Sequence, residues 1–319
     1  MAFCPNCGNQ GTDGGFCPNC GTRLGGAEYA MPACNVQISN FKENPNIVCT
    51  DRLGCFEVYE YQKDVSVDPS SAVASYFMHQ MNFRKKQVFC TLNGNTIKTQ
   101  AGAMQWTAGP VVMNSGVKGA KDFLGKAFKG MATGESLAKP LYTGTGYVVL
   151  EPTYRYIILE DISKWGSGMV LDDGMFLACD ASIQEEVVRR KNASSAVLGG
   201  EGLFNLSLSG NGVAALESCV PREELVEIIL NNDEVRIDGN MAVAWSKSLS
   251  FTVEKSTKSL LGSMASGEGL VNVYRGSGKI LMAPVVPGTL MKAKNQPKNT
   301  EKSSSNGVVG SIASSLLDL

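Results

Sequence analysis

The stretch Gly210-Asn211-Gly212-Val213-Ala214-Ala215-Leu216 occurs in three versions along this chain. The same Gly-x-Gly, followed by an apolar run, is found at Gly144-Thr145-Gly146 and at Gly276-Ser277-Gly278, so the three copies are evenly spaced. The run Met175-Phe176-Leu177-Ala178 recurs as Met241-Ala242-Val243-Ala244 at the same spacing. A fixed period, here of about 66 residues, indicates a repeated structural unit. The sequence therefore predicts three copies of one β-unit.

Short β-branched and apolar runs surround these glycines and are separated by Gly, Asn and Asp turns. This pattern is typical of a β-sandwich or barrel. We predict a mainly β fold of three repeated β-sandwich or double-stranded β-helix-like units, at about 87–152, 164–218 and 230–284, with a few short helices. Each Gly-x-Gly is expected between two strands, where glycine supplies a positive φ. A dinucleotide-binding loop is excluded because no helix follows the glycines.

The composition suits a turn-rich β protein, since 35 of the 319 residues are glycine and only 18% are charged. A net charge of −1 provides no electrostatic footprint for nucleic acid or for an anionic membrane surface. No apolar run reaches the length of about 18 residues that a membrane-spanning helix requires. The first residues lack the pattern of a signal or transit peptide. We therefore expect a cytoplasmic protein.

Four cysteines near the N-terminus form a metal-binding pattern. Cys4 and Cys7, and then Cys17 and Cys20, make two Cys-Pro-Asn-Cys motifs, each followed by Gly. Two such knuckles complete a tetrahedral site of four thiolates, as in structural zinc sites. A thioredoxin-like redox motif would need one such pair at the start of a helix. Residues 1–24 are therefore predicted to be a zinc ribbon, and its closed site leaves no position for catalysis.

The remaining six cysteines lie in apolar sequence contexts and are expected to be reduced and buried. They are Cys34, Cys49, Cys55, Cys90, Cys179 and Cys219.

Residues 25–33 are Gly-rich and link the ribbon to the repeated β domain, predicted at 34–290. Within that domain, Asp68-Pro69 supplies an N-cap followed by a first-turn proline, and apolar residues follow at helical spacing. A helix is therefore expected over about 69–82. His79 is the only histidine and lies on it. A single histidine in this setting is expected to pack or face solvent, not to bind a metal or act as a base.

Two further segments are predicted to form amphipathic helices. Residues 115–133 interleave Lys118, Lys121, Lys126 and Lys129 with apolar residues. This helix either covers one end of the β core or contacts an anionic membrane or an acidic partner, although four lysines are too few to anchor it alone. Residues 291–319 form a flexible tail whose short terminal helix carries Ile312, Leu316 and Leu317. This helix either docks on its own domain or is captured by a partner protein.

A family resemblance is carried by four elements: Gln100-Ala101-Gly102-Ala103-Met104-Gln105-Trp106, Gly134-Glu135-Ser136-Leu137, Gly199-Gly200-Glu201-Gly202-Leu203-Phe204 and Gly267-Glu268-Gly269-Leu270. Over roughly residues 90–285 the chain resembles the altered inheritance of mitochondria protein 24 family. The resemblance implies a fold like the tryptophan RNA-binding attenuation protein, often assembled as a trimer, with no established catalytic activity. Mitochondrial members are linked to inner-membrane organisation and some bacterial relatives to stress-response gene neighbourhoods.

The chain departs from this family by its zinc ribbon, its helix near 69–82 and its C-terminal tail. Because it also lacks a transit peptide, the mitochondrial role is not carried across. No family motif supplies catalytic residues, so none are transferred.

Together these features favour a non-enzymatic oligomeric scaffold or interaction protein with a structural zinc ion, in a membrane- or stress-associated assembly. The expected partners are further copies of the chain, with a trimer favoured by the resemblance, and an unidentified protein that contacts the ribbon or the C-terminal helix. RNA binding is an alternative by fold analogy alone, and the near-zero net charge disfavours it.

A cupin-like enzyme is disfavoured because its catalytic metal usually needs two or three histidines, and this chain has one. The carboxylate pairs Asp172-Asp173 and Glu185-Glu186 are interpreted as solvated turn or strand-end charges.

Overall fold

The computed structural model of this protein describes residues 33–63, 66–115, 139–189, 204–238, 241–255 and 270–285, and the backbone of four short strands nearer the N-terminus. The chain divides into two units, Met1–Val286 and Pro287–Leu319, and the second unit lies wholly outside the described residues. The described part is mainly β, as the sequence predicts.

The four N-terminal strands form two small antiparallel hairpins. β1 (Ala2–Phe3) pairs with β2 (Gln10–Gly11), and β3 (Gly15–Phe16) pairs with β4 (Arg23–Leu24). The two registers are equivalent, because Phe3 lies opposite Gln10 in the first hairpin and Phe16 lies opposite Arg23 in the second.

A nine-stranded antiparallel sheet contains most of the first half of the chain. Its strands are β5 (Ile47–Leu53), β6 (Phe56–Tyr61), β7 (Lys86–Thr99), β8 (Met104–Ala108), β9 (Val111–Asn114), β10 (Leu141–Leu150), β11 (Tyr156–Asp161), β13 (Phe176–Asp180) and β16 (Val213–Ser218). The main path runs β11-β16-β13-β7-β10-β8, with β6 paired to β7, β5 to β6 and β9 to β10.

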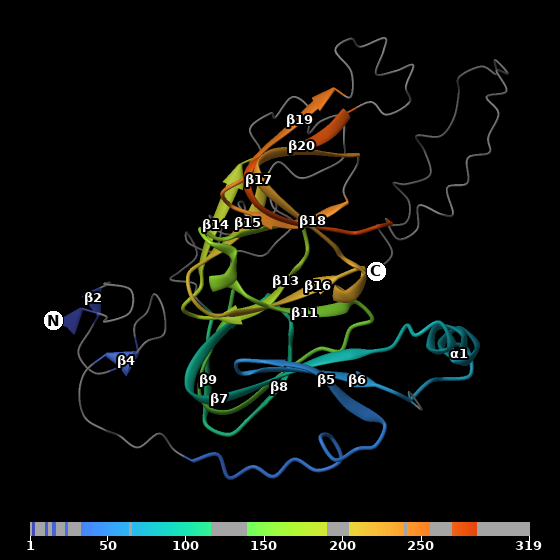
Figure 1. The fold of residues 1–319 in the computed structure, drawn as a ribbon. Coiled ribbons are helices and arrows are strands. Elements are labelled where there is room, and N and C mark those ends of the chain that lie inside the picture. The colour runs from blue at the N-terminus through green and yellow to red at the C-terminus, as the bar shows by residue number, and fades with distance from the viewer. Residues whose placement is uncertain are drawn as a thin grey trace, which may run out of the picture. The chain divides into compact units, whose positions relative to one another are not determined.

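A seven-stranded antiparallel sheet contains most of the second half (Figure 1). Its strands are β12 (Met169–Leu171), β14 (Gln184–Arg189), β15 (Phe204–Ser209), β17 (Val226–Asp238), β18 (Ala242–Ser246), β19 (Ser250–Lys255) and β20 (Leu270–Met282). The main path runs β14-β15-β12-β18-β20-β17, with β19 paired to β20. Two short 3-10 helices, η1 (Ile162–Trp165) and η2 (Arg222–Glu224), lie in the connections.

The Gly210–Gly212 turn is one of the points where the chain passes from one sheet to the other. It joins β15 of the seven-stranded sheet to β16 of the nine-stranded sheet. Gly210 and Gly212 have φ values of 104° and 150°, which side chains rarely adopt. The expectation of a glycine corner with positive φ is therefore confirmed at this turn.

The other two Gly-x-Gly copies lie inside continuous strands, so the expectation that each separates two strands is wrong for them. Gly144 and Gly146 belong to β10, and Gly276 and Gly278 belong to β20. In both cases the pairing register with the neighbouring strand shifts near the glycines, as it does between Thr143 and Thr145. A bulge of this kind bends a strand without ending it.

Some strand boundaries recur at the period of the Gly-x-Gly copies between the second and third predicted units. The first and last residues of β18 lie one period after those of β13, and the first and last residues of β19 lie one period after those of β14. Hydrogen bonds recur in the same way, since the Ser182 hydroxyl donates to the Asn211 carbonyl at 2.7 Å and the Ser248 hydroxyl donates to the Ser277 carbonyl at 2.8 Å.

The main hydrophobic core combines residues of both sheets. Phe176 and Leu216 come from the nine-stranded sheet, whereas Leu208 and Leu281 come from the seven-stranded sheet, and all are buried. Trp165 of η1 completes this core, and its indole N–H donates to the Glu160 carboxylate at 3.1 Å. The sheets are therefore held together mainly by burial of apolar surface.

An ion-paired cluster also joins the two sheets. Glu185 on β14 lies 3.3 Å from the Lys98 ammonium on β7 and 2.9 Å from that of Lys139. The interpretation of Glu185 as a solvated charge is therefore wrong, because its side chain is only 16% exposed. The neighbouring Glu186 points to the other face of the strand and is 63% exposed.

The helix expected at 69–82 is α1 (Ala72–Gln80), with Ser71 at its N-cap position. The Asp68 carboxylate accepts the backbone N–H groups of Ser70 and Ser71 at 2.8 and 3.1 Å. Asp68 thus caps the turn that leads into the helix, although regular helix begins later than predicted. None of the helices in the described ranges has the length and apolar character needed to cross a membrane.

Candidate functional site

The residues predicted from the sequence to bind metal or partners all lie outside the described residues. They are Cys4, Cys7, Cys17, Cys20, Lys118, Lys121, Lys126, Lys129, Ile312, Leu316 and Leu317. Within the described ranges, no group of three or more His, Cys, Asp and Glu side chains is arranged to hold a metal ion. The described structure contains one further candidate site, which the sequence did not indicate.

This site is a cavity of about 590 Å³ beside α1, which we call the α1 cavity. Its volume lies within the range of about 300–1,000 Å³ found for small-molecule sites. Its lining comes from α1, from the chain that leaves β6 and from the chain that enters β7, with Asn46 and Tyr154 added. The lining residues are Asn46, Tyr61, Gln62, Lys63, Val67, Ala72, Ser75, Tyr76, His79, Gln80, Phe83, Arg84, Lys85 and Tyr154.

The cavity exists because α1 does not pack closely against the sheet. No residue of α1 is buried. Val73, Tyr76 and Phe77 on the helix, and Met81 just after it, are between 60% and 80% exposed. A surface helix normally directs such an apolar stripe at the core. The apolar residues that predicted this helix are therefore presented outwards, which sequence periodicity alone does not reveal.

Aromatic rings form much of the cavity lining. Phe83 stacks on Tyr154 with ring centroids 6.1 Å apart and an angle of 9° between the ring planes. Phe83 also meets Tyr156 edge to face. Tyr61 is fixed by its hydroxyl, which donates to the Gln87 side chain at 2.6 Å. These contacts give the wall opposite α1 a defined shape before any ligand binds.

Three basic residues are among the described residues that line the cavity. Lys63, Arg84 and Lys85 line it, and none of the lining residues that the structure describes is Asp or Glu. The Arg84 guanidinium is held by Gln62 and by Glu60, whose carboxylate lies 3.2 Å away. The Lys85 ammonium lies 5.8 Å from the centre of the Tyr61 ring. His79 lies half-buried in the α1 wall. The described lining therefore combines aromatic rings with basic side chains, of which Arg84 is ion-paired with Glu60.

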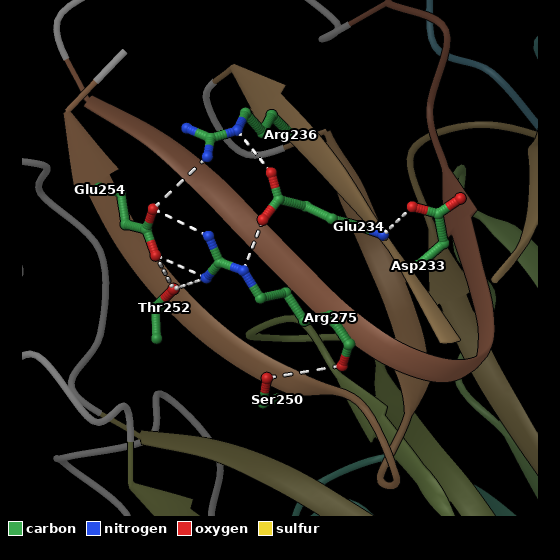
Figure 2. A network of polar contacts seen from close by, with 7 residues as sticks. All are labelled: Asp233, Glu234, Arg236, Ser250, Thr252, Glu254 and Arg275. Atoms are coloured by element: carbon green, nitrogen blue, oxygen red, sulfur yellow. Dashed lines mark hydrogen bonds and ion pairs between the residues drawn. The ribbon is translucent and has the colours of Figure 1, made fainter. Parts of the chain in front are cut away.

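A second polar cluster covers part of the seven-stranded sheet and is shown in Figure 2. Arg275 of β20 makes a bidentate contact with Glu254 of β19, at 2.6 and 3.0 Å, and also contacts Glu234 of β17. Arg236 donates to Glu234 at 2.7 Å. Hydrogen bonds from Arg275 and Thr252 lower the pKa of Glu254 to about 2. These contacts link the three strands β17, β19 and β20. The two arginines balance the charge of the two glutamates, so the cluster has no net charge to attract a ligand.

The described cysteines are free, and only some match their expected environment. Cys90 and Cys179 are buried, whereas Cys49 and Cys219 are exposed, so the expectation of burial is wrong for that second pair. Cys49 lies on an outward-facing position of β5, and Cys219 follows the end of β16. Burial raises the pKa of the Cys55 thiol to about 12. A thiol with a raised pKa is a poor nucleophile, so Cys55 is not activated for nucleophilic attack.

The fold is mainly β: two curled antiparallel sheets share a hydrophobic core, and the helix α1 lines a cavity. Residues 78–285 match the model of the family described as mitochondrial biogenesis AIM24. The chain therefore belongs to this family, which confirms the resemblance seen in the sequence.

Two streptococcal proteins are similar to this chain. An uncharacterized protein of Streptococcus pyogenes serotype M6 is 30% identical over 196 residues, which cover 59% of this chain and 76% of that protein. The crystal structure of a Streptococcus pyogenes protein matches at 26% identity with a TM-score of 0.48, covering 66% of this chain and 92% of the other.

The α1 cavity crosses the boundary of the family match. Phe83, Arg84, Lys85 and Tyr154 lie inside residues 78–285, whereas the lining at 61–63 precedes them. The cavity therefore combines the family's β domain with the segment before it.

Proposed function

We propose that this protein is a non-enzymatic binding protein, in which an oligomeric β scaffold carries a structural zinc site and a ligand cavity. The observation that carries the proposal is the character of the α1 cavity. Its described lining offers rings, amides and cations, and no carboxylate that could orient His79 as an acid or base is among the described lining residues. Such a surface binds a ligand without providing the groups that usually transform one.

The structural zinc site is proposed at Cys4, Cys7, Cys17 and Cys20. Two observations support it: each Cys-Pro-Asn-Cys follows directly on the first strand of a hairpin, and the two hairpins share one register. Two equivalent hairpins can present four thiolates to one ion. Zinc would supply the folding energy that so small a segment lacks.

The scaffold is proposed to consist of three related β-units with a fold like the tryptophan RNA-binding attenuation protein. Strands and hydrogen bonds that recur at the period of the Gly-x-Gly copies support the relation between the second and third units. A trimer is the proposed assembly, because the family resemblance implies it.

The proposed partner surfaces are the ribbon and the C-terminal segment with Ile312, Leu316 and Leu317. The lysine-rich segment, Lys118 to Lys129, is proposed as a further contact with a membrane or an acidic partner. A reducing compartment such as the cytoplasm suits this function, since every described cysteine is free. RNA binding remains an alternative supported only by fold analogy.

Metal content and molar mass test this proposal directly. Purified full-length protein is expected to contain one zinc ion per chain, and the double variant Cys4→Ser, Cys17→Ser is expected to contain none. The matched control Cys49→Ser, Cys219→Ser removes two exposed cysteines and should retain zinc. Zinc that survives loss of Cys4 and Cys17 would refute the ribbon, and a monomer by light scattering would refute the oligomeric scaffold.

A further inference from the structure

We propose that α1 is a self-association surface, through which two copies of this chain pair about a two-fold axis. The contact is made by Val73, Phe77 and Met81, which we call the α1 ridge. The inference adds a contact to the proposed trimer and does not depend on that trimer. It follows from the position of the ridge, from the composition of the helix and from the geometry of a two-fold contact.

The α1 ridge faces away from the cavity. Val73, Phe77 and Met81 follow one another at intervals of four residues, so they lie along one side of the helix. The Met81 N–H donates to the Phe77 carbonyl at 3.0 Å, which keeps Met81 in line with the helix. Ser75 and His79, on the opposite side of α1, line the cavity. Closure of α1 onto its own sheet would therefore leave the ridge uncovered.

The ridge is apolar, exposed and already oriented. Val73, Phe77 and Met81 are 68%, 62% and 80% exposed. The Phe77 ring meets the Tyr76 ring edge to face, with the ring centroids 5.5 Å apart. Burial of a ring that is already held in place costs less side-chain entropy than burial of a freely rotating one. The ridge is therefore suited to contact another apolar surface.

The composition of α1 favours a protein surface over a lipid one. None of its nine residues is Asp, Glu, Lys or Arg. Helices that lie in a membrane interface are rich in Lys and Arg on their polar face. The polar residues Ser75 and His79 instead line the cavity of their own chain. α1 thus lacks the basic polar face that lies against headgroups.

A second copy of α1 is the surface that these features fit best. A two-fold axis places each residue near it beside its own copy, so a charged residue there would meet a like charge. The uncharged α1 avoids this repulsion. Ala74 lies next to Phe77 on the helix surface, and its small side chain allows two helices to approach closely. Ridges of residues spaced by four interdigitate when two helices cross at about −50°.

The area of the ridge sets the expected strength of pairing. An aromatic side chain buries about 150–250 Å², so Phe77, at 62% exposed, offers on the order of 100–150 Å². With Val73 and Met81 included, one pair of helices buries several hundred Å², which is less than the roughly 1,000 Å² of a specific interface. A single pair should therefore associate weakly. Two trimers that face each other would repeat the contact at each chain and associate more tightly.

Sedimentation velocity at increasing concentrations of full-length protein tests the pairing. The parent is expected to reach an even number of copies, six if the proposed trimer exists and two if it does not. Phe77→Glu places like charges face to face and is expected to halve this number, with association weakened at least about tenfold. Ser75→Glu adds the same charge on the opposite side of α1 and should leave the number unchanged. A parent that stays at one or three copies would overturn the proposal.

Mixing two variants tests whether the ridge meets its own copy. Phe77→Lys alone should fail to pair, as Phe77→Glu does. Equal amounts of the two variants are expected to pair again, because opposite charges then face each other across the axis. Each variant should keep the thermal unfolding midpoint of the parent, since Phe77 is an exposed residue. A mixture of folded variants that does not pair would refute the two-fold contact.

The same measurements separate this inference from a membrane contact and from the proposed scaffold. Flotation with phosphatidylcholine and phosphatidylglycerol vesicles is expected to be unaffected by Phe77→Glu. If Phe77→Glu abolishes flotation and leaves the number of copies unchanged, the ridge contacts lipid and the pairing is wrong. A change from two copies to one would support the pairing and refute the trimer. Three copies of both parent and variant would support the trimer and refute the pairing.

Discussion

The Asp180 carboxylate on β13 accepts the backbone N–H of Val213 on β16 at 2.8 Å. This bond lies at the corner where the chain crosses between the two sheets. At the equivalent positions of the next unit, the Ser246 hydroxyl accepts the backbone N–H of Lys279 at 3.0 Å. Equivalent backbone N–H groups are therefore bound by a carboxylate at the Gly210–Gly212 corner and by a hydroxyl in the next unit, where β20 continues without a break.

Replacing Asp180 tests how much the corner depends on this acceptor. Asp180→Ala leaves the partly buried Val213 N–H without its partner and is expected to cost about 1–3 kcal/mol of unfolding free energy. Asp180→Asn retains an acceptor and should cost less. Urea unfolding of both variants at pH 7 measures the difference. Equal losses in the two variants would show that the hydrogen bond is not the cause.

Asp180 also predicts a pH dependence. Burial raises its pKa above the usual value of 3.8. A carboxyl group whose pKa is higher in the folded state stabilises the fold below its unfolded pKa, and this contribution is lost as pH rises through the folded pKa. The stability of the parent protein relative to Asp180→Asn should therefore fall as pH rises from 3.8 through the raised folded pKa. A difference that stays constant over this range would contradict the assignment.

Gly212→Ala should be more destabilising than an alanine at an uncrowded glycine. A Cβ at Gly212 would lie 3.0 Å from both the Asp180 Cβ and the Ser182 Oγ, and φ is 150°. Gly102 has φ of 79° but nothing within 4 Å of a new Cβ, so Gly102→Ala isolates the backbone strain. We expect about 1–2 kcal/mol for Gly102→Ala and a larger loss for Gly212→Ala, measured by denaturant unfolding.

Glu185→Gln should destabilise the fold, and its neighbour provides the control. Glu185 is the carboxylate between Lys98 and Lys139, and the substitution removes the negative charge that faces both ammonium groups. A loss of about 3 kcal/mol is expected from such a partly buried cluster. Glu186→Gln removes an exposed partner of Lys247 and should change stability by less than about 0.5 kcal/mol. Similar effects of the two substitutions would show that Glu185 is solvated in solution.

The surface network of Figure 2 predicts acid sensitivity. The pKa of Glu254 is lowered to about 2 by its hydrogen bonds with Arg275 and Thr252. A carboxylate with a lowered folded pKa stabilises the fold above its unfolded pKa, near 4.5, and this contribution is lost as pH falls through about 2. Glu254→Gln should reduce the slope of stability against pH over this window. The effect should be small, because these residues are solvated.

Zinc removal should affect only the N-terminal hairpins. The buried core clusters comprise residues between Ile47 and Ala283, so the β domain has a hydrophobic core of its own. A strong chelator is expected to expose residues 1–32 to proteolysis and to leave the thermal midpoint of the β domain unchanged. A large drop in that midpoint on chelation would show that metal stabilises the β domain directly.

Much of the strand content could be predicted from the sequence because it depends on local patterns. β13 and β18 follow from short apolar runs bounded by turn residues, and the repeat period supports both assignments. The helix at α1 follows from the Asp68-Pro69 signal and the spacing of apolar residues. Each of these signals extends over a few neighbouring residues, so no knowledge of the fold is needed to detect it.

The tertiary structure alone decided which copy of Gly-x-Gly would bend a strand and which would end one. That outcome depends on the partner strands. The long strand β17 pairs with β20 on both sides of the glycines of β20, so β20 continues. In the second unit, β12 pairs with β15 in one sheet and β11 pairs with β16 in the other, so the chain turns between β15 and β16. The pairing of Lys98 with Glu185 joins residues far apart in the chain, and neither neighbourhood indicates the other. The α1 cavity likewise depends on tertiary packing. Periodicity predicts an amphipathic helix, but only packing determines whether its apolar face is buried, and in α1 it is not.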